Sequence, residues 1–201
     1  MMIKYLIASL CLFLSAECIS AQHYTYWPII FEKEPNGVFS FSKKWDYPEG
    51  VIKHDDGHFE KTDGKKLEAT DTAHMSFTAN CKTNVQGGYT IRYCYATRKG
   101  SNIHLNFTDG APAYASKFNA TLKNGTFHFE PGIIYPELIP GEKTSYTVTR
   151  SKLILYQKNY SVAHMISGYI TAEFTETTQN SKKAIHTNKY YLEGYFKTPV
   201  N

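Results

Sequence analysis

The stretch that decides the fold is Asn119-Ala-Thr-Leu-Lys-Asn124-Gly125-Thr-Phe-His-Phe-Glu130. Asn-Gly is the preferred central pair of a two-residue type I′ β-turn. With Asn124 and Gly125 in that turn, the facing pairs gather apolar side chains on one side: Leu122 with Phe127 and Ala120 with Phe129. The turn and the apolar face select the same register, so the stretch predicts an antiparallel hairpin with one buried face.

The same alternation of apolar and polar residues recurs along the chain, and it predicts an all-β fold of about nine to eleven strands. No segment after the N-terminus shows helical periodicity over three turns. Antiparallel connections indicate a β-sandwich or a barrel. The long connections over residues 131–145 and 177–189 favour an antiparallel β-sandwich, and a calycin-like β-barrel is the alternative. The inward sets are Ile103, Leu105 and Phe107; Ile166, Gly168, Ile170, Ala172 and Phe174; and Tyr190, Leu192, Gly194 and Phe196.

Two glycines, Gly168 and Gly194, fall in the middle of inward-facing strand patterns. A glycine in a strand interior marks a site where a backbone or a large group approaches closely. We therefore expect either a neighbouring backbone or a large aromatic ring over each glycine. If neither fills the space, an internal ligand cavity is expected beside them.

A second hairpin is predicted around Gly87 and Gly88, between Cys81 and Cys94. If the two glycines form a two-residue turn, counting outward places Cys81 opposite Cys94. That pair is not hydrogen-bonded, so the Cα atoms approach to about 4.5 Å, which a disulfide can span. The spacing predicts a Cys81–Cys94 disulfide that stiffens one hairpin.

The N-terminal residues are typical of a secretory signal. Lys4 precedes an apolar run over residues 5–14, and smaller residues lead to Ala21, after which we expect cleavage. The run is shorter than the roughly 20 residues of a transmembrane helix. The sequence thus predicts a signal peptide over residues 1–21 and a single all-β domain over residues 22–201 of an exported protein, which is periplasmic, secreted or at the cell surface.

The charged residues favour no nucleic-acid partner. The net charge is +4, and Lys and Arg are scattered among acids. A nucleic-acid surface needs clustered basic residues. The basic doublets, such as Lys43-Lys44, therefore indicate solvated surface.

The densest cluster of potentially reactive side chains lies between residues 53 and 74. Carboxylates and imidazoles close together can bind a metal ion or act as acid and base. The spacing matches no specific metal motif, and turns with incidental histidines are the favoured interpretation. The candidate metal ligands are His54, Asp56, His58 and His74. No nucleophile elbow and no phosphate-binding glycine loop is present, so an enzyme is disfavoured and no cofactor is expected.

The sixteen tyrosines are the stronger functional clue. Tyrosine combines a flat apolar ring with a polar tip, which suits protein and glycan surfaces. The first hypothesis is a binding protein that engages a protein or glycan through exposed aromatic strand faces. The alternatives are a carrier of a small apolar ligand and a secreted hydrolase or metal-binding protein that uses residues 54–74. The tyrosines on faces predicted to point outward are Tyr93, Tyr95, Tyr169, Tyr191 and Tyr195.

Overall fold

The computed structural model describes residues 25–46, 51–54, 56, 58–61, 64–65, 75–108, 116–134 and 139–201. The predicted signal peptide and His74 lie outside these residues. Within them the structure is nearly all strand, which confirms the all-β prediction, and the helical elements are two short 3₁₀ turns, η1 (Ser40–Lys43) and η2 (Val85–Gly87). The strands are β1 (Trp27–Phe31), β2 (Trp45–Asp46), β3 (Val51–Lys53), β4 (Phe59–Lys61), β5 (Met75–Ser76), β6 (Ala79–Thr83), β7 (Tyr89–Ile91), β8 (Tyr93–Lys99), β9 (Asn102–Thr108), β10 (Phe118–Lys123), β11 (Thr126–Glu130), β12 (Lys143–Leu155), β13 (Met165–Gln179) and β14 (Ile185–Pro199).

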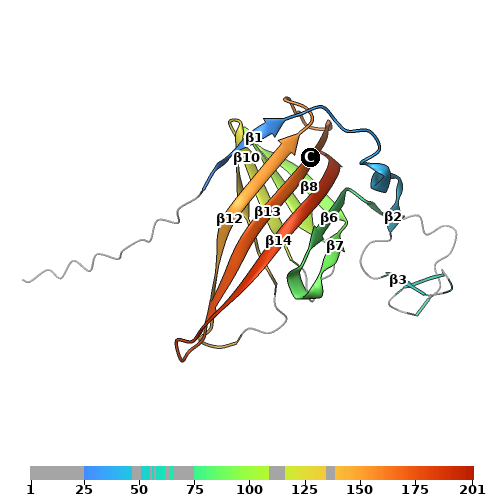
Figure 1. Cartoon of the computed structure of the whole chain (residues 1–201). Helices are drawn as coiled ribbons and strands as arrows, with labels where there is room; N and C mark the ends of the chain where they lie inside the picture. The colour runs from blue at the N-terminus through green and yellow to red at the C-terminus, as the bar shows by residue number, and fades with distance from the viewer. Residues whose placement is uncertain are drawn as a thin grey trace, which may run out of the picture.

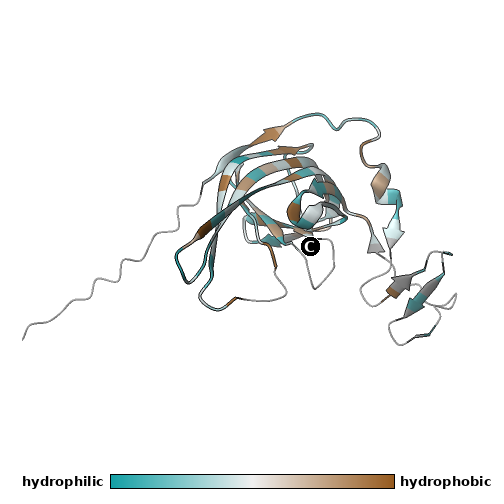
Figure 2. Cartoon of the chain, turned by 60° about the horizontal axis from the view of Figure 1, so that its bottom comes forward, coloured by the Kyte–Doolittle hydropathy of each residue, from teal (hydrophilic) through white to brown (hydrophobic). Residues whose placement is uncertain are grey.

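Ten strands form one sheet in the order β7-β6-β14-β13-β12-β1-β11-β10-β9-β8. The sheet curls until it is nearly closed, as Figures 1 and 2 show. The barrel alternative is therefore the architecture found, and the two-sheet sandwich that we favoured is not formed. Two small hairpin-like pairs, β2 with β5 and β3 with β4, lie outside the barrel sheet.

The barrel closes because its two edge strands belong to one continuous segment. β7 and β8 stand at opposite ends of the strand order, yet only Arg92 separates them in the chain. The end of the chain reinforces this closure. The backbone N–H of Asn201 donates to the carbonyl of Ala96 at 2.9 Å, and that of Arg98 donates to the carbonyl of Asn201 at 2.7 Å. Long connections elsewhere do not prevent closure, which is why loop length was a poor guide to the architecture.

The sheet is mixed because of β1. β1 runs antiparallel to β11, with Trp27 opposite Phe127, and parallel to β12, with Ile29 opposite Leu153. The expectation of purely antiparallel connections is therefore wrong at this one strand.

The hairpin of residues 119–130 has the predicted register. Leu122 pairs with Phe127 and Asn119 pairs with Glu130. Asn124 and Gly125 have φ of 49° and 77°, as a type I′ turn requires.

The hairpin of the two cysteines has a different register from the predicted one. Thr83 pairs with Tyr89, and Cys81 pairs with Ile91. The reason is the turn: η2 and its flanking residues take up the chain between Thr83 and Tyr89, so the turn is longer than two residues. Cys94 lies on β8, opposite Phe107 on β9. The two cysteines are free and fully buried, and this desolvation raises the pKa of both thiols. The predicted Cys81–Cys94 disulfide is not formed.

Close packing explains both inner-face glycines. A Cβ at Gly168 would lie 2.2 Å from the carbonyl oxygen of Ile154 and 3.0 Å from the Phe196 ring. A Cβ at Gly194 would lie 2.2 Å from the carbonyl oxygen of Asn80. The expected close approach of backbone and aromatic ring is confirmed, so these glycines admit neighbouring strands and Phe196 rather than a ligand.

Aromatic rings fill the barrel interior. Phe107 and Phe196 pack edge to face at 5.3 Å, and Phe118 packs against Phe174 at 5.7 Å. All four rings are buried. The alternating hydropathy along the curled strands in Figure 2 reflects this one-sided packing.

Residues 32–46 form an N-terminal strap that follows β1 and runs outside the barrel (Figure 1). The backbone N–H of Glu32 donates to the carbonyl of Leu155 at 3.1 Å. Glu34 accepts a hydrogen bond from buried Ser167 at 3.2 Å and pairs with Lys197 at 3.6 Å. The strap is thus attached to the outer side of β12, β13 and β14.

Candidate functional site

The barrel mouth is the end of the barrel where the β8–β9 turn, the β10–β11 turn and the loop after β12 gather. A cleft of about 390 Å³ opens there. Its lining combines inner-face residues of several strands with residues of these turns. The lining residues are Ile29, Phe31, Arg98, Ser101, Ile103, Leu122, Lys123, Asn124, Gly125, Leu155, Lys158, Asn159, Tyr160, Ser161 and His164.

The floor and the rim of the barrel mouth differ in character. The floor is apolar because strands β1, β9, β10 and β12 end with inward-facing aliphatic side chains there, namely Ile29, Ile103, Leu122 and Leu155. The rim carries basic side chains, and among the lining residues none is acidic: the basic ones are Arg98, Lys123, Lys158 and the titratable His164. An apolar floor under a cationic rim matches a ligand that has an apolar body and an anionic group.

Arg98 is the most constrained of these cations. Its Nη2 donates to the carbonyl of Tyr160, which holds the guanidinium at the mouth. Its Nε is buried and has no hydrogen-bond partner in the described part of the chain. A buried donor without a partner is rare and costly, so the guanidinium is not fully satisfied by the contacts that hold it.

Tyr160 forms the wall behind Arg98 and is 6% exposed. Its hydroxyl accepts a hydrogen bond from the backbone N–H of Gln157 at 3.0 Å. Burial raises the pKa of Tyr160 to about 12, so the phenol is neutral at ordinary pH. The wall thus adds a neutral surface beside the basic side chains of the rim.

The first two predicted binding tyrosines, Tyr93 and Tyr95, differ in their exposure to solvent. Tyr93 is only 6% exposed, so the prediction that it points to solvent is wrong, whereas Tyr95 is 42% exposed. Phe77 packs edge to face on Tyr93 at 5.9 Å, and the two tyrosine rings stack at 6.5 Å. Phe77, which lies between β5 and β6, therefore covers the Tyr93 ring that the alternation of β8 predicts to be exposed.

The second pair, Tyr169 and Tyr195, lies under the strap. The two rings are 5.0 Å apart, and the Tyr169 hydroxyl donates to Glu193. Phe39 of the strap packs edge to face on Tyr195 at 6.2 Å and is itself 9% exposed. Both tyrosines are half-buried, and Tyr195 is a structural contact of the strap.

Tyr191 lies apart from both pairs, in an outer cleft of about 590 Å³. Its backbone N–H donates to the Asn84 side chain at 2.9 Å. The five predicted tyrosines therefore do not form one exposed face. The outer cleft is lined by Asn84, Thr149, Thr171, Glu173, Phe174, Thr175, Lys189, Tyr190, Tyr191 and Glu193.

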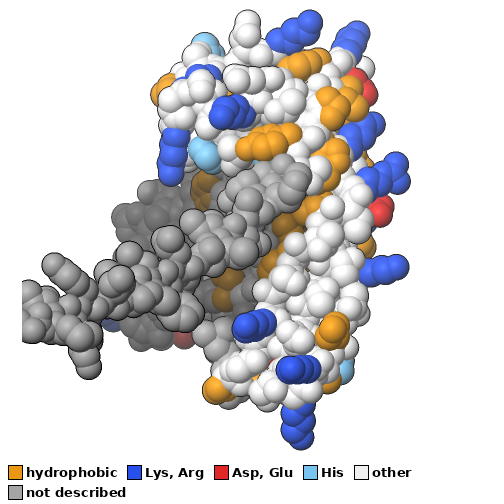
Figure 3. Space-filling view, turned by 90° about the vertical axis from the view of Figure 1, so that its left-hand side faces the viewer, with side chains coloured by type: hydrophobic (Ala, Val, Ile, Leu, Met, Phe, Trp, Pro, Cys, Tyr) orange, Lys and Arg blue, Asp and Glu red, His pale blue; other side chains and the backbone are white. Residues whose placement is uncertain are grey.

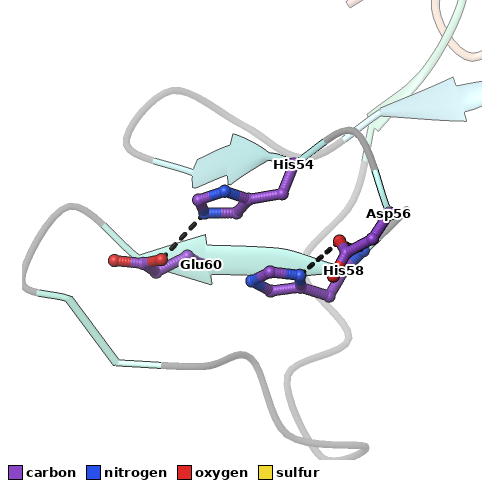
Figure 4. Close-up of polar contacts among 4 residues, drawn as sticks. All are labelled: His54, Asp56, His58 and Glu60. Atoms are coloured by element: carbon purple, nitrogen blue, oxygen red, sulfur yellow. Dashed lines mark hydrogen bonds and ion pairs between the residues drawn. The ribbon is translucent and has the colours of Figure 1, made fainter.

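Three of the four predicted metal ligands, His54, Asp56 and His58, come together on the β3–β4 hairpin (Figure 4). The imidazoles of His54 and His58 stack at 4.2 Å. His54 Nε2 lies 2.8 Å from a carboxylate oxygen of Glu60, and His58 Nδ1 pairs with Asp56. The hydrogen bond from the His58 backbone N–H, assisted by its ring, lowers the pKa of Asp56.

Glu60 is the member of this cluster that the sequence analysis missed. Its signal in the sequence is its spacing: His58 and Glu60 are two residues apart, and Glu60 belongs to β4. Residues i and i+2 of a strand share one face.

Within the described residues, no helix has the length and apolar character needed to cross a bilayer. On the face seen in Figure 3, the Lys and Arg side chains stand mostly singly among apolar and uncharged ones. This distribution provides no continuous basic surface on that face. The chain was compared with family models, curated proteins and solved structures, and none of them matches it.

Proposed function

We propose that the protein is an exported binding protein whose barrel mouth takes a small ligand with an apolar body and an anionic group. The observation that most supports this proposal is the cleft of the barrel mouth. There, apolar side chains of the barrel strands lie beneath Arg98, Lys123 and Lys158. Export rests on the signal predicted for residues 1–21. This proposal develops the carrier hypothesis, with the ligand at the mouth of the barrel instead of beside the inner glycines.

Two kinds of contact would recognise such a ligand. Hydrogen bonds between Arg or Lys and an oxyanion are charge-assisted and stronger than neutral ones. Arg98 offers the charge of its guanidinium at the cleft. The aliphatic floor would take up the apolar body, and removal of apolar surface from water contributes roughly 25 cal/mol per Å².

The size of the cleft limits the ligand class. Small-molecule sites span about 300–1,000 Å³. The cleft, at about 390 Å³, lies at the lower end of that range. A medium-chain carboxylate, such as decanoate, is therefore a suitable probe, and a protein or large glycan would not fit inside it.

Isothermal titration calorimetry with decanoate tests the proposal, with decanol as the uncharged ligand of equal chain length. We expect decanoate to bind more tightly than decanol. The double change Lys123→Glu with Lys158→Glu should weaken decanoate binding more than about tenfold, or 1.4 kcal/mol. The matched control is Lys182→Glu with Lys183→Glu, in the β13–β14 turn at the other end of the barrel, which should bind as the unchanged protein does. Equal binding of the two ligands, or no effect of the mouth variants, would refute the proposal.

We also retain a second candidate, glycan binding in the outer cleft. One observation favours it: Tyr191 lies there beside threonine hydroxyls and the carboxylates of Glu173 and Glu193. A ring flanked by hydrogen-bonding groups suits a sugar. Binding of oligosaccharides that is lost in Tyr191→Ala, but kept in the mouth variants, would select this candidate.

A further inference from the structure

We propose that His54, His58 and Glu60 on the β3–β4 hairpin form a binding site for a divalent d-block cation, with Zn²⁺ as the representative ion. The site is separate from the barrel mouth and does not depend on the proposed ligand there. It rests on the arrangement drawn in Figure 4.

The hairpin places the three side chains on one face. β3 and β4 are antiparallel, with Ile52 opposite Glu60, and the backbone N–H of His54 extends the pairing by donating to the carbonyl of His58 at 2.9 Å. His54 thus lies across from His58. Since His58 and Glu60 are two residues apart on one strand, all three side chains project from the same side.

The donor atoms are close enough for one ion. One ligand atom from each of the three residues lies within 4.8 Å of the others. A tetrahedral Zn²⁺ has bonds of about 2.0–2.1 Å, which places its ligand atoms about 3.4 Å apart. Side-chain rotation therefore suffices to bring the two most distant ligand atoms to the separation that the ion requires.

The stack of the two rings must open when the ion binds. The rings of His54 and His58 are within 6° of parallel at a separation of 4.2 Å. A metal ion lies in the plane of each imidazole that ligates it, so one ion cannot bind both rings while they are stacked. Both rings are half-exposed, with 39% and 38% of the side chain accessible, so they are free to turn.

Asp56 supplies the orienting contact that metal-binding histidines usually have. Its carboxylate accepts from the His58 backbone N–H at 3.1 Å and pairs with His58 Nδ1. A carboxylate at Nδ1 keeps the proton on that nitrogen and leaves the Nε2 lone pair available to a metal. Asp56 is therefore a positioning residue of the proposed site, whereas the sequence analysis named it as a candidate ligand.

The ligand types select the class of ion. Two imidazoles and one carboxylate suit Zn²⁺ and related d-block ions, whereas Ca²⁺ and Mg²⁺ prefer oxygen ligands throughout. Three protein ligands leave one coordination position for water. Zn²⁺ should therefore bind in preference to Mg²⁺ at equal concentration.

The test is calorimetric titration of the purified, untagged protein with Zn²⁺. We expect one ion per chain, a loss of about 10–100-fold in affinity for Asp56→Asn, and losses at least as large for His54→Ala, His58→Ala and Glu60→Gln. His186→Ala, which removes an exposed histidine of β14, is the matched control and should bind normally. Decanoate binding should be the same in all of these variants, so failure of this site is distinguishable from failure of the barrel-mouth proposal.

Nuclear magnetic resonance of the imidazoles gives a second readout on the unchanged protein. Zn²⁺ should shift the ring signals of His54 and His58 and leave those of His104 and His186 in place. In the metal-free protein, Asp56→Asn should reduce the Nδ1–H tautomer of His58, an effect that a merely structural role would not produce. Absence of Zn²⁺ binding, or undiminished binding in the double variant His54→Ala with His58→Ala, would overturn the proposal.

Discussion

The barrel mouth and the outer aromatic surface of β13 and β14 are alike in composition and opposite in accessibility. Both combine apolar or aromatic side chains with basic ones. At the mouth, strand ends and short turns leave a cleft. On the outer surface, Phe39 of the strap packs over Tyr195 and Tyr156, and Lys197 lies 5.0 Å from the Phe39 ring centre. A segment packed from elsewhere, not the alternation of a strand, therefore decides whether an aromatic surface is available for binding.

The largest expected effect comes from Phe39→Ala. Phe39 is 9% exposed and contacts three aromatic rings. Truncation of a buried phenylalanine to alanine costs about 3–5 kcal/mol, and we expect the lower end because Phe39 lies on a strap. Urea denaturation measures the change.

Phe31→Ala is the matched control, because Phe31 is 40% exposed and lines the mouth. It should cost about 1 kcal/mol or less in stability and weaken decanoate binding. Equal destabilisation by the two changes would break the distinction between a covered surface and an open cleft.

The next effect concerns Arg98. Lysine at this position keeps the positive charge but loses the planar fork and the Nε donor. Arg98→Lys should therefore weaken decanoate binding by about tenfold, or 1.4 kcal/mol, in calorimetric titration. Circular dichroism must first show an intact fold, because Arg98 also holds the carbonyl of Tyr160. Unchanged affinity in a folded variant would show that the planar guanidinium of Arg98 has no part in binding.

A pH titration compares the two regions in a single sample. Burial raises the pKa of Tyr156, beneath the strap, and of Tyr160, at the mouth, to about 12. Because these pKa values exceed the value of about 10 in the unfolded chain, the folded state holds these protons more tightly. The stability they contribute is complete below pH 10 and is lost as the pH rises towards 12.

Ultraviolet absorbance of tyrosinate follows this titration. In Phe39→Ala the pKa of Tyr156 should fall towards 10, while the pKa of Tyr160 should stay near 12. A joint fall of both values would mean that the strap also supports the mouth.

The smallest expected effect comes from Tyr169→Phe. This change removes the hydroxyl that donates to Glu193 but keeps the ring against Tyr195. A single hydrogen bond contributes about 0.5–1.5 kcal/mol, and the exposed position favours the lower value. Urea denaturation should therefore detect only a small loss in the free energy of unfolding. A loss as large as that of Phe39→Ala would mean that the hydroxyl, and not the packing of the rings, stabilises this surface.

The two predicted hairpins show how much of the fold the sequence determines locally. At residues 119–130 the turn pair and the apolar face agree, and the predicted register is the one formed. At the cysteine hairpin the apolar face was ambiguous, so the prediction relied on a two-residue turn alone. The actual turn is longer, because the Asn84 side chain bonds the backbone of β14 at Lys189 and Tyr191. Such long-range contacts are invisible to local counting.

Local sequence patterns also could not predict the closure of the barrel or which residues line the cleft at its mouth. The inward residues of β9, β13 and β14 were predicted correctly, yet the same pattern serves a sandwich and a barrel. The cleft of the mouth combines residues that are far apart in the sequence, from Ile29 to His164, so no contiguous motif marks it. The β3–β4 cluster is local in sequence, so the density of imidazoles and carboxylates was enough to name His54, Asp56 and His58 as candidate ligands, although their spacing matches no known metal motif.

The most direct test of the central claim is a map of backbone amide shifts in the ¹⁵N-labelled protein as decanoate is added. Binding at the barrel mouth predicts shifts at Arg98, Ser101 and His164 and in the turn at residues 124–125, with little change at Tyr169 and Tyr195. Shifts centred on Tyr169 and Tyr195, or no shifts at saturating decanoate, would contradict the assignment of the mouth as the binding site.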